Sequence, residues 1–490
     1  RVINGPMIWS PDANALWGPV PELKNYFLCG GIIPGFSQSG GLGLLAAQWM
    51  INGEPQYDMF AWDIARFGEW ADKKFTKARV EDAYTHRFKI HFPNEERSAG
   101  RPARVRPAYE MQKEMGCVHG LNCGWEHPLW FADKPGFEEN TGFTRQNWWE
   151  PVGREARMLR ENVGVIDISN FANYVVNGPG AKEWLDKLVA NHVPSEIGRS
   201  CLTPMISVLG GVAGDFTITK VADDEYMMIG SGMAERYHQR FFNMVDLPED
   251  TKFEVATDRI VGFNVAGPKS RDLLQRLTNA DLTNEKFRFM RSRTIKVAGV
   301  TCLAIRVSFT GDLGWELHCA EEDQVKLYSA LLDVARQLDG GPVGGRALGS
   351  LRIEKGYGSW GREYSQEYWP QEVGLDGLIK LDKEFLNKEA YLKIKENAPR
   401  SQLSVFEIEV AHDADASGGE PIFSAEGKPV GFVTSGAYGY SINKSLALGT
   451  SDPSVVGQGD DVEVFILGKP HKARILESAP FDPKGRRLRG

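Results

Sequence analysis

The sequence predicts an α+β protein of several domains that ends in a small β-barrel or sandwich. From about residue 155 onward, strand-like runs alternate with amphipathic helical runs, a texture typical of antiparallel sheets covered by helices. Residues 401–490 hold short strands and turns without a convincing helix, which favours an all-β terminal domain. A chain of 490 residues is long enough for about three domains.

Residues 1–66 form the first unit, in which a strand leads through a glycine-rich loop into a helix. The strand is predicted over 26–31, the loop over 30–41 and the helix over 42–52, where Gly53 stops it. Glycines before a helix let backbone N–H groups approach an anionic or electron-rich ligand. A tight turn that needs positive φ explains the same glycines, so both interpretations stay open. The pattern starts in the middle of a unit, as if the front of this domain lay elsewhere.

The middle of the chain connects this unit to the alternating region. Residues 67–150 are rich in aromatic, charged and proline residues and show little periodicity. The alternating region has amphipathic helices expected over 178–193, 268–277 and 323–338, each flanked by strands. The predicted domains are therefore 1–66, 67–150, 151–395 and 396–490.

The composition is that of a globular protein without a nucleic-acid or membrane partner. The net charge of −8 disfavours a polyanionic ligand. No apolar run reaches the roughly 18 uncharged residues of a membrane span. The six cysteines are spread thinly, which indicates reduced thiols in a reducing compartment. We expect the cytoplasm or, in a eukaryote, the mitochondrial matrix.

Metal and nucleophile motifs are absent from the sequence. Cys117, His119, Cys123 and His127 lie close together but match no familiar zinc spacing. No Gly-x-Ser-x-Gly or phosphate-binding loop appears. We therefore expect no metal site.

Two acids stand beside glycine-rich turns. Asp215 follows the turn 210–214 and precedes an alternating strand, so its carboxylate either points into a cavity or caps the turn. Glu316 follows the turn 311–314 and lies between two apolar residues. It is either a solvated acid on the outer face of a hairpin or a carboxylate that binds something polar.

Arg352 and Trp360 follow in a helix and the loop after it. Arg352 lies in the predicted helix 347–355 among apolar neighbours, as a buried partner for a carboxylate or as a fork that binds a ligand. Trp360 lies in the loop 356–361, where it either presents a flat face to an aromatic ring or packs in the core.

Several separated segments follow one another in the order of a known family. They are Val307–Glu316, Ser350–Gly356, Glu372–Asp382 with Asn387–Ala390, and Gly431–Gly436 with Lys444–Gly449. They resemble the aminomethyltransferase family, the glycine-cleavage T-protein and its relatives, over about residues 150–490. The front resembles the end of a flavin-dependent amine-oxidoreductase domain, through Glu22–Phe27, Ser39–Gly41 and Trp49–Pro55. Two further segments, Gly124–Phe131 and Asn147–Gly153, resemble the linker region of dimethylglycine and sarcosine dehydrogenases.

The resemblance implies both a fold and a chemistry. The fold is a T-protein-like folate-binding domain of mixed antiparallel sheets with helices. A small β-barrel follows it, and the rear fragment of a flavin-oxidoreductase domain precedes it. The resemblance implies that the chain is part of an enzyme in which FAD oxidises an N-methyl amine of the dimethylglycine or sarcosine type. Tetrahydrofolate then captures the one-carbon unit as 5,10-methylenetetrahydrofolate.

The resemblance also implies site residues. Asp215 matches the catalytic acid that contacts the folate amines and assists proton movement. Glu316 matches the acid that hydrogen-bonds the pterin, whose amino and ring N–H groups are donors. Arg352, Trp360 and Phe309 lie where relatives contact folate. On the flavin side the corresponding residues are Gly35, Ser39, Gly40 and Gly41.

The sequence departs from the family pattern in three places. Phe309 stands where relatives often have Tyr, so one hydroxyl contact is lost, and Ser231-Gly232 replaces an Asn of the glycine-cleavage proteins. No Gly-x-Gly-x-x-Gly unit is present, so FAD requires a region or subunit outside this chain. Two alternatives remain: a stand-alone folate-dependent demethylase or methyltransferase, and a non-catalytic partner subunit of a flavoprotein complex.

Overall fold

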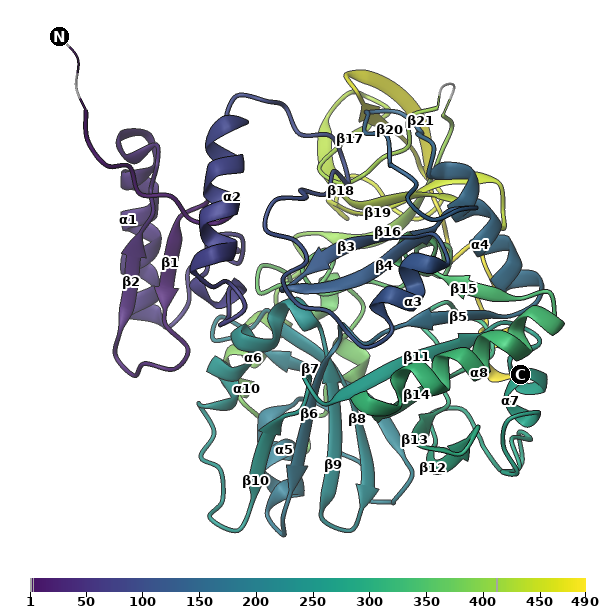
Figure 1. Cartoon of the computed structure of the whole chain (residues 1–490). Coiled ribbons are helices and arrows are strands. Elements are labelled where there is room, and N and C mark those ends of the chain that lie inside the picture. Colours follow the sequence, from purple (N-terminus) through teal and green to yellow (C-terminus); the bar gives the residue numbers. More distant parts are fainter. Residues whose placement is uncertain (1, 3, 411–412) are drawn as a thin grey trace.

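The computed structural model describes residues 2, 4–410 and 413–490 (Figure 1). Two open sheets and a closed barrel carry most of this chain, with smaller two-stranded pairs at the front. The predicted α+β class with a terminal barrel is confirmed. The predicted domain limits at 66, 150 and 395 stay predictions. None of the helices in the described ranges is both long and apolar enough to cross a membrane.

A hairpin and one long helix form the front unit at the edge of the molecule (Figure 1). Strands β1 (Leu16–Pro19) and β2 (Phe27–Gly30) pair antiparallel. Helix α1 (Gly35–Asn52) buries Leu42 and Trp49 in a cluster with Trp17 of β1. The helix thus packs through one apolar face onto the hairpin.

The start of α1 corrects the predicted loop over 30–41. The helix begins at Gly35, so Ser39, Gly40 and Gly41 lie within it rather than before it. Once later turns are anchored by packing, each further helical turn adds hydrogen bonds without the cost of a new nucleus, and glycine can join it. At Gly53 the backbone turns left-handed, with φ of 82°, and the helix ends as predicted.

The first open sheet has five antiparallel strands in the order β10-β6-β9-β8-β7. They are β6 (Ala172–Asn177), β7 (Ser200–Ile206), β8 (Val212–Ala222), β9 (Glu225–Gly230) and β10 (Lys252–Val255). Alternate residues of β6, β8 and β9 enter one core, as the two-residue period of a strand requires. Helices α5 (Ala181–Leu188) and α6 (Glu235–Phe242) contribute to the same core.

The second open sheet has six strands in the order β12-β13-β14-β11-β5-β15. They are β5 (Gly164–Asp167), β11 (Ile260–Ala266), β12 (Ser292–Val297), β13 (Val300–Ile305), β14 (Gly314–Ala320) and β15 (Gly341–Val343). Only the β15–β5 pair is parallel among the described strands of this sheet. Helices α7 (Ser270–Gln275) and α8 (Gln324–Gln337) share its core. All three predicted helices therefore exist, with shorter ends than predicted.

The closed barrel follows the two sheets and has six strands in the order β16-β19-β18-β17-β20-β21. They are β16 (Gln402–Ile408), β17 (Pro421–Ser424), β18 (Pro429–Gly439), β19 (Lys444–Ser451), β20 (Asp461–Ile466) and β21 (Lys469–Ile475). Closure leaves the barrel without exposed strand edges. A short helix, α11 (Arg486–Arg489), follows the barrel and was not predicted.

Connecting elements hold the sheets and the barrel together. They are α2 (Lys73–Thr85), α3 (Tyr109–Glu114), β3 (Cys117–Asn122), β4 (Trp125–Phe131), α4 (Trp149–Glu161), α9 (Gly345–Glu354) and α10 (Lys388–Lys395). Five 3-10 turns complete them: Ile64–Arg66, Gly232–Ala234, Glu321–Asp323, Pro370–Glu372 and Asp376–Leu378. Helix α9 reaches the barrel, where the Ser350 hydroxyl donates to the Tyr438 carbonyl oxygen at 2.7 Å. This contact places α9 between the second sheet and the barrel.

Candidate functional site

The predicted folate-side residues come from both open sheets, from the loop before β14, and from α9 and the loop after it. Asp215 lies on β8 and Glu316 on β14. Phe309 lies in the loop that leads into β14, Arg352 lies in the last turn of α9, and Trp360 lies in the loop beyond it. Different contacts hold each of these side chains in position.

Asp215 is a partly buried carboxylate that receives no hydrogen bond from any side chain in the described ranges. Burial raises its pKa to about 6, while its own backbone N–H acts in the opposite direction. Tyr364 lies close by, since burial first and the Asp215 charge second raise the pKa of its phenol. A carboxyl group with a pKa near 6 can both accept and release a proton at neutral pH.

The strand that carries Asp215 is held by the loop after α9. The Trp360 indole N–H donates to the Ala213 carbonyl oxygen at 3.1 Å. The loop before β8 comes so close to this segment that a Cβ on Gly211 would lie 1.9 Å from the Gln366 carbonyl oxygen. Only glycine permits this approach, so the position of Asp215 depends on the neighbouring loop.

Trp360 itself is 4% exposed and lies in an aromatic cluster. Its ring centroid lies 4.9 Å from that of Phe60 and 5.2 Å from that of Tyr237. Of the two interpretations of its loop, the structure shows packing. Trp360 supports the Asp215 strand from behind.

Glu316 has a side chain that is 17% exposed, and it does not lie on a fully solvated face. Its Oε2 lies 3.5 Å from Nε2 of His318, two residues along the same face of β14. The His318 ring is buried, and neither of its nitrogens has a hydrogen-bond partner among the described residues. Sequence reasoning missed His318, although the two-residue period of a strand would have placed it beside Glu316.

Arg352 is buried, and its guanidinium donates three hydrogen bonds. Its Nη1 donates to Glu363 Oε2 at 3.0 Å and to the Tyr357 carbonyl oxygen at 2.9 Å, and its Nη2 donates to Ser435 Oγ at 2.8 Å. Of the two interpretations of Arg352, the structure shows the buried partner of a carboxylate. The guanidinium clamps the loop after α9 onto the barrel, and Glu363 was missed because its pairing requires the folded loop.

Phe309 stacks on Tyr357, with ring centroids 5.9 Å apart and planes 18° apart. Tyr357 is partly buried, and burial raises the pKa of its phenol. The pair therefore places a tyrosine beside the position where the sequence has lost one.

The flavin-side residues lie apart from this group. Gly35, Ser39, Gly40 and Gly41 occupy the first half of α1, at the edge of the molecule (Figure 1). A Cβ on any of the three glycines would meet no atom within 4 Å. The structure does not bring these residues together with Asp215 or Glu316.

No metal cluster is found in the described ranges: no three His, Cys, Asp or Glu side chains gather there as ligands. His119 Nε2 instead lies 3.0 Å from the Gln112 side-chain oxygen. Burial lowers the pKa of His127 to about 4, so its ring is neutral.

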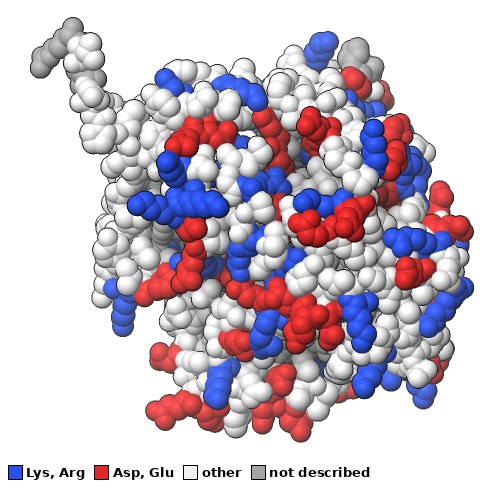
Figure 2. All heavy atoms as spheres, viewed as in Figure 1, with Lys and Arg blue, Asp and Glu red and all other residues white. Residues whose placement is uncertain are grey.

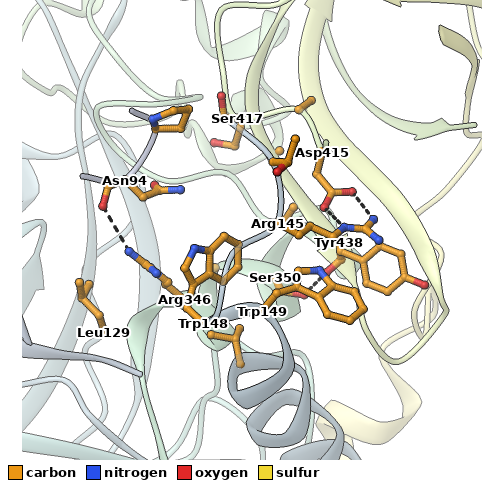
Figure 3. A pocket seen from close by; sticks show the side chains of 18 of the residues that line it. Asn94, Leu129, Arg145, Trp148, Trp149, Arg346, Ser350, Asp415, Ser417 and Tyr438 are labelled. Atoms are coloured by element: carbon orange, nitrogen blue, oxygen red, sulfur yellow. Dashed lines mark hydrogen bonds and ion pairs between the residues drawn. The ribbon is translucent and has the colours of Figure 1, made fainter. Parts of the chain in front are cut away.

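A cavity of about 390 Å³ lies between α9, the start of α4, the barrel and the connecting region (Figure 3). Arg352 contributes to its wall. Asp215, Glu316, Phe309 and Trp360 do not line it. The cavity is therefore a feature apart from the two acids.

Three family descriptions match the chain. "GCVT N-terminal domain" matches residues 108–383, and "Glycine cleavage T-protein C-terminal barrel domain" matches residues 402–482. "FAD dependent oxidoreductase central domain" matches residues 52–105.

Curated relatives extend the similarity over the whole chain. Mitochondrial dimethylglycine dehydrogenase of Mus musculus is 35% identical in an alignment of 484 positions that covers 97% of this chain and 55% of the relative. 4-Methylaminobutanoate oxidase (formaldehyde-forming) of Paenarthrobacter nicotinovorans is 30% identical in an alignment of 503 positions that covers 100% of this chain and 60% of the relative. The chain thus spans little more than half the length of these relatives.

A solved structure shares the fold. The glycine cleavage system aminomethyltransferase T from Bartonella henselae aligns with a TM-score of 0.66 at 21% identity. The alignment covers 77% of this chain and 98% of that one.

Proposed function

The chain belongs to the glycine cleavage T-protein family, and we propose that it carries out tetrahydrofolate-dependent one-carbon transfer. In this proposal the transfer is coupled to flavin-dependent oxidative demethylation of an N-methyl amine of the dimethylglycine or sarcosine type. The product is 5,10-methylenetetrahydrofolate. The names of the curated relatives support the choice of amine.

The observation that carries the proposal is Asp215, a carboxylate with a pKa of about 6 and no side-chain partner in the described chain. Tetrahydrofolate, when bound, supplies two amines that take up the one-carbon unit. Asp215 would accept the proton released there and stabilise the positive charge that develops. Glu316, partly exposed beside His318, has the acceptor oxygens that the pterin N–H groups require.

The remaining predicted residues would support this site rather than react in it. Trp360 holds the backbone two residues before Asp215, and Arg352 holds the loop that carries Trp360. Phe309 and Tyr357 would offer stacked ring faces for a folate ring system. None of these groups needs to change its protonation state.

The flavin would be held mostly outside this chain. Residues 52–105 match the central domain of an FAD-dependent oxidoreductase, but no Gly-x-Gly-x-x-Gly unit is present. The glycines of α1 that were assigned to the flavin side form part of a helix with open space around them. These residues do not fit FAD by themselves, so we assign them no step. The partner in the proposal is the missing flavin portion or a separate subunit.

Titration of tetrahydrofolate into the protein tests the proposal. We expect binding that weakens at least about tenfold in Asp215→Ala and in Glu316→Ala, because each removes a charge-assisted hydrogen bond. Asp223→Asn is the matched control, since Asp223 is exposed in the turn after β8 and should bind normally. Absence of binding, or equal binding by all variants, would contradict the proposal.

A second candidate is suggested by the name of the bacterial relative, which is formaldehyde-forming. In that case water rather than folate would take the one-carbon unit. Product analysis with the completed flavoprotein separates the two. Formaldehyde in undiminished yield in the presence of tetrahydrofolate favours the second candidate, and 5,10-methylenetetrahydrofolate favours the first.

A further inference from the structure

The cavity of about 390 Å³ lies where separately matched parts of the chain meet (Figure 3). Asn94 comes from the segment that matches the flavin-oxidoreductase central domain, and Arg346 comes from α9. Trp148 and Trp149 stand at the start of α4, and Tyr438 comes from β18 of the barrel. We call it the Arg–Trp cavity.

The carboxylates of its wall already have their hydrogen-bond donors. Asp415 accepts two bonds from Arg145, at 2.7 and 2.8 Å. Glu139 accepts from the Trp130 indole N–H and from Arg346 Nη2, both at 2.7 Å. Glu420 accepts from the backbone N–H groups of residues 417 and 418, both at 2.8 Å. Glu96 accepts from the Leu121 backbone N–H at 3.2 Å and lies 3.6 Å from the Arg101 guanidinium. The acidic side of the wall therefore has little capacity left for a cation.

Several hydrogen-bond donors of the same wall have no acceptor within the part of the protein that the structure describes. The Trp149 indole nitrogen and Nη1 of Arg346 are buried and have no hydrogen-bond partner among the described residues. Arg362 is exposed and forms no ion pair with any described carboxylate. A buried donor without an acceptor costs about 1–3 kcal/mol, so an acceptor supplied by a ligand would be favoured here.

The wall also offers flat aromatic surfaces. The Arg145 guanidinium lies 4.8 Å from the Trp149 ring and 4.5 Å from the Tyr438 ring. The Arg346 guanidinium lies 4.9 Å from the Trp148 ring. Such guanidinium–ring stacks are rigid, and a planar ligand can extend them.

From these observations we infer that the Arg–Trp cavity binds a planar organic anion, of the aromatic carboxylate class. Its carboxylate would pair with the exposed Arg362 and, after a small rotation that turns them toward the ligand, with the spare donors of Arg346 and Trp149. Its ring would lie against the indoles at the start of α4. This site is separate from the proposed folate site: only Arg352 is shared with the predicted folate residues, and its guanidinium is occupied by Glu363, Tyr357 and Ser435.

Calorimetric titration with 2-naphthoate and with its neutral analogue 2-naphthamide tests the inference. We expect naphthoate to bind and naphthamide to bind at least about tenfold more weakly, because only the anion makes charge-assisted hydrogen bonds. Trp149→Phe keeps an aromatic ring and removes the spare N–H, and Arg362→Gln removes the free charge. Each should weaken naphthoate binding by about tenfold.

Trp9→Phe is the matched control, because the Trp9 indole N–H is also buried without a hydrogen-bond partner among the described residues but lies outside the cavity, so naphthoate binding should be unchanged. Thermal melts monitored by circular dichroism confirm that each variant is folded. Lack of naphthoate binding, equal binding of naphthamide, or equal weakening by Trp9→Phe would overturn the inference. Displacement of naphthoate by tetrahydrofolate would also overturn it, because the cavity would then belong to the folate site. Failure of tetrahydrofolate to bind at all, with naphthoate binding intact, would contradict only the proposed function.

Discussion

At the residue scale, Asp215 links the stability of the protein to pH. Its pKa is raised to about 6 in the fold, from an ordinary value of 3.8. The folded state therefore holds a proton that the unfolded chain has released at pH 4–6, and stability from this group falls as pH rises through that window. Above pH 6 this loss of stability is constant, at about 3 kcal/mol.

Asp215→Asn removes this loss, because an amide does not ionise. We expect the variant to be more stable than the parent by about 3 kcal/mol at pH 8 and by much less at pH 4. Urea unfolding at the two pH values measures the difference. A difference that does not change with pH would show that burial does not raise this pKa. The same variant should lose folate-dependent activity, so stability and activity would move in opposite directions.

At the element scale, the Arg352–Glu363 pair holds the loop between α9 and the barrel. Both side chains are largely or fully buried, and Glu363 also accepts from the Ser359 backbone N–H at 2.9 Å and from the Thr434 hydroxyl at 2.8 Å. Removing one partner of a buried pair leaves the other charge without compensation. We expect Arg352→Gln to lower the free energy of unfolding by about 3 kcal/mol.

The double variant Arg352→Gln with Glu363→Gln checks this prediction. It removes both charges, so it should recover part of the lost stability in chemical unfolding. If the two substitutions are simply additive, the two side chains do not act as a pair. Because the loop also carries Trp360, the single variant should weaken tetrahydrofolate binding without contacting the ligand.

At the scale of the whole molecule, α1 presents an apolar face to solvent. Phe36 is fully exposed and Ile51 is 81% exposed. Figure 2 shows few charged atoms over this edge, whereas the rest of the visible face carries both signs. Helix α1 itself contains no charged residue. Apolar patches of this kind on a protein surface usually meet another surface, as the proposed flavin portion would provide.

Substitutions on this face should change association but not stability. We expect Phe36→Ser and Ile51→Ser to shift the free energy of unfolding by less than about 0.5 kcal/mol. We expect them to reduce self-association in sedimentation velocity, because they remove exposed apolar area. Trp49→Ala is the buried comparison and should cost about 3–5 kcal/mol. If both surface variants self-associate as the parent does, this face of α1 does not mediate association.

The sequence by itself determined the class of fold, the terminal barrel and the three helices of the alternating region, because hydrophobic periodicity is a local property. It also indicated which acids to examine. The sequence placed the start of α1 seven residues too late, at residue 42 instead of Gly35. The low helix propensity of the glycines in this segment is outweighed by the cooperativity of a helix whose later turns are packed.

Only the tertiary structure decided what the chosen residues do. Ser435, which binds the Arg352 guanidinium, lies 83 residues away in the chain. The Trp360 indole is buried, and its N–H donates to the carbonyl oxygen of Ala213, 147 residues earlier in the chain. Burial by segments distant in sequence raises the pKa of Asp215 to about 6. The Arg–Trp cavity forms from segments scattered between Pro93 and Leu467, which no sequence spacing connects. Desolvation and charge pairing depend on neighbours in space, and these are absent from any local pattern.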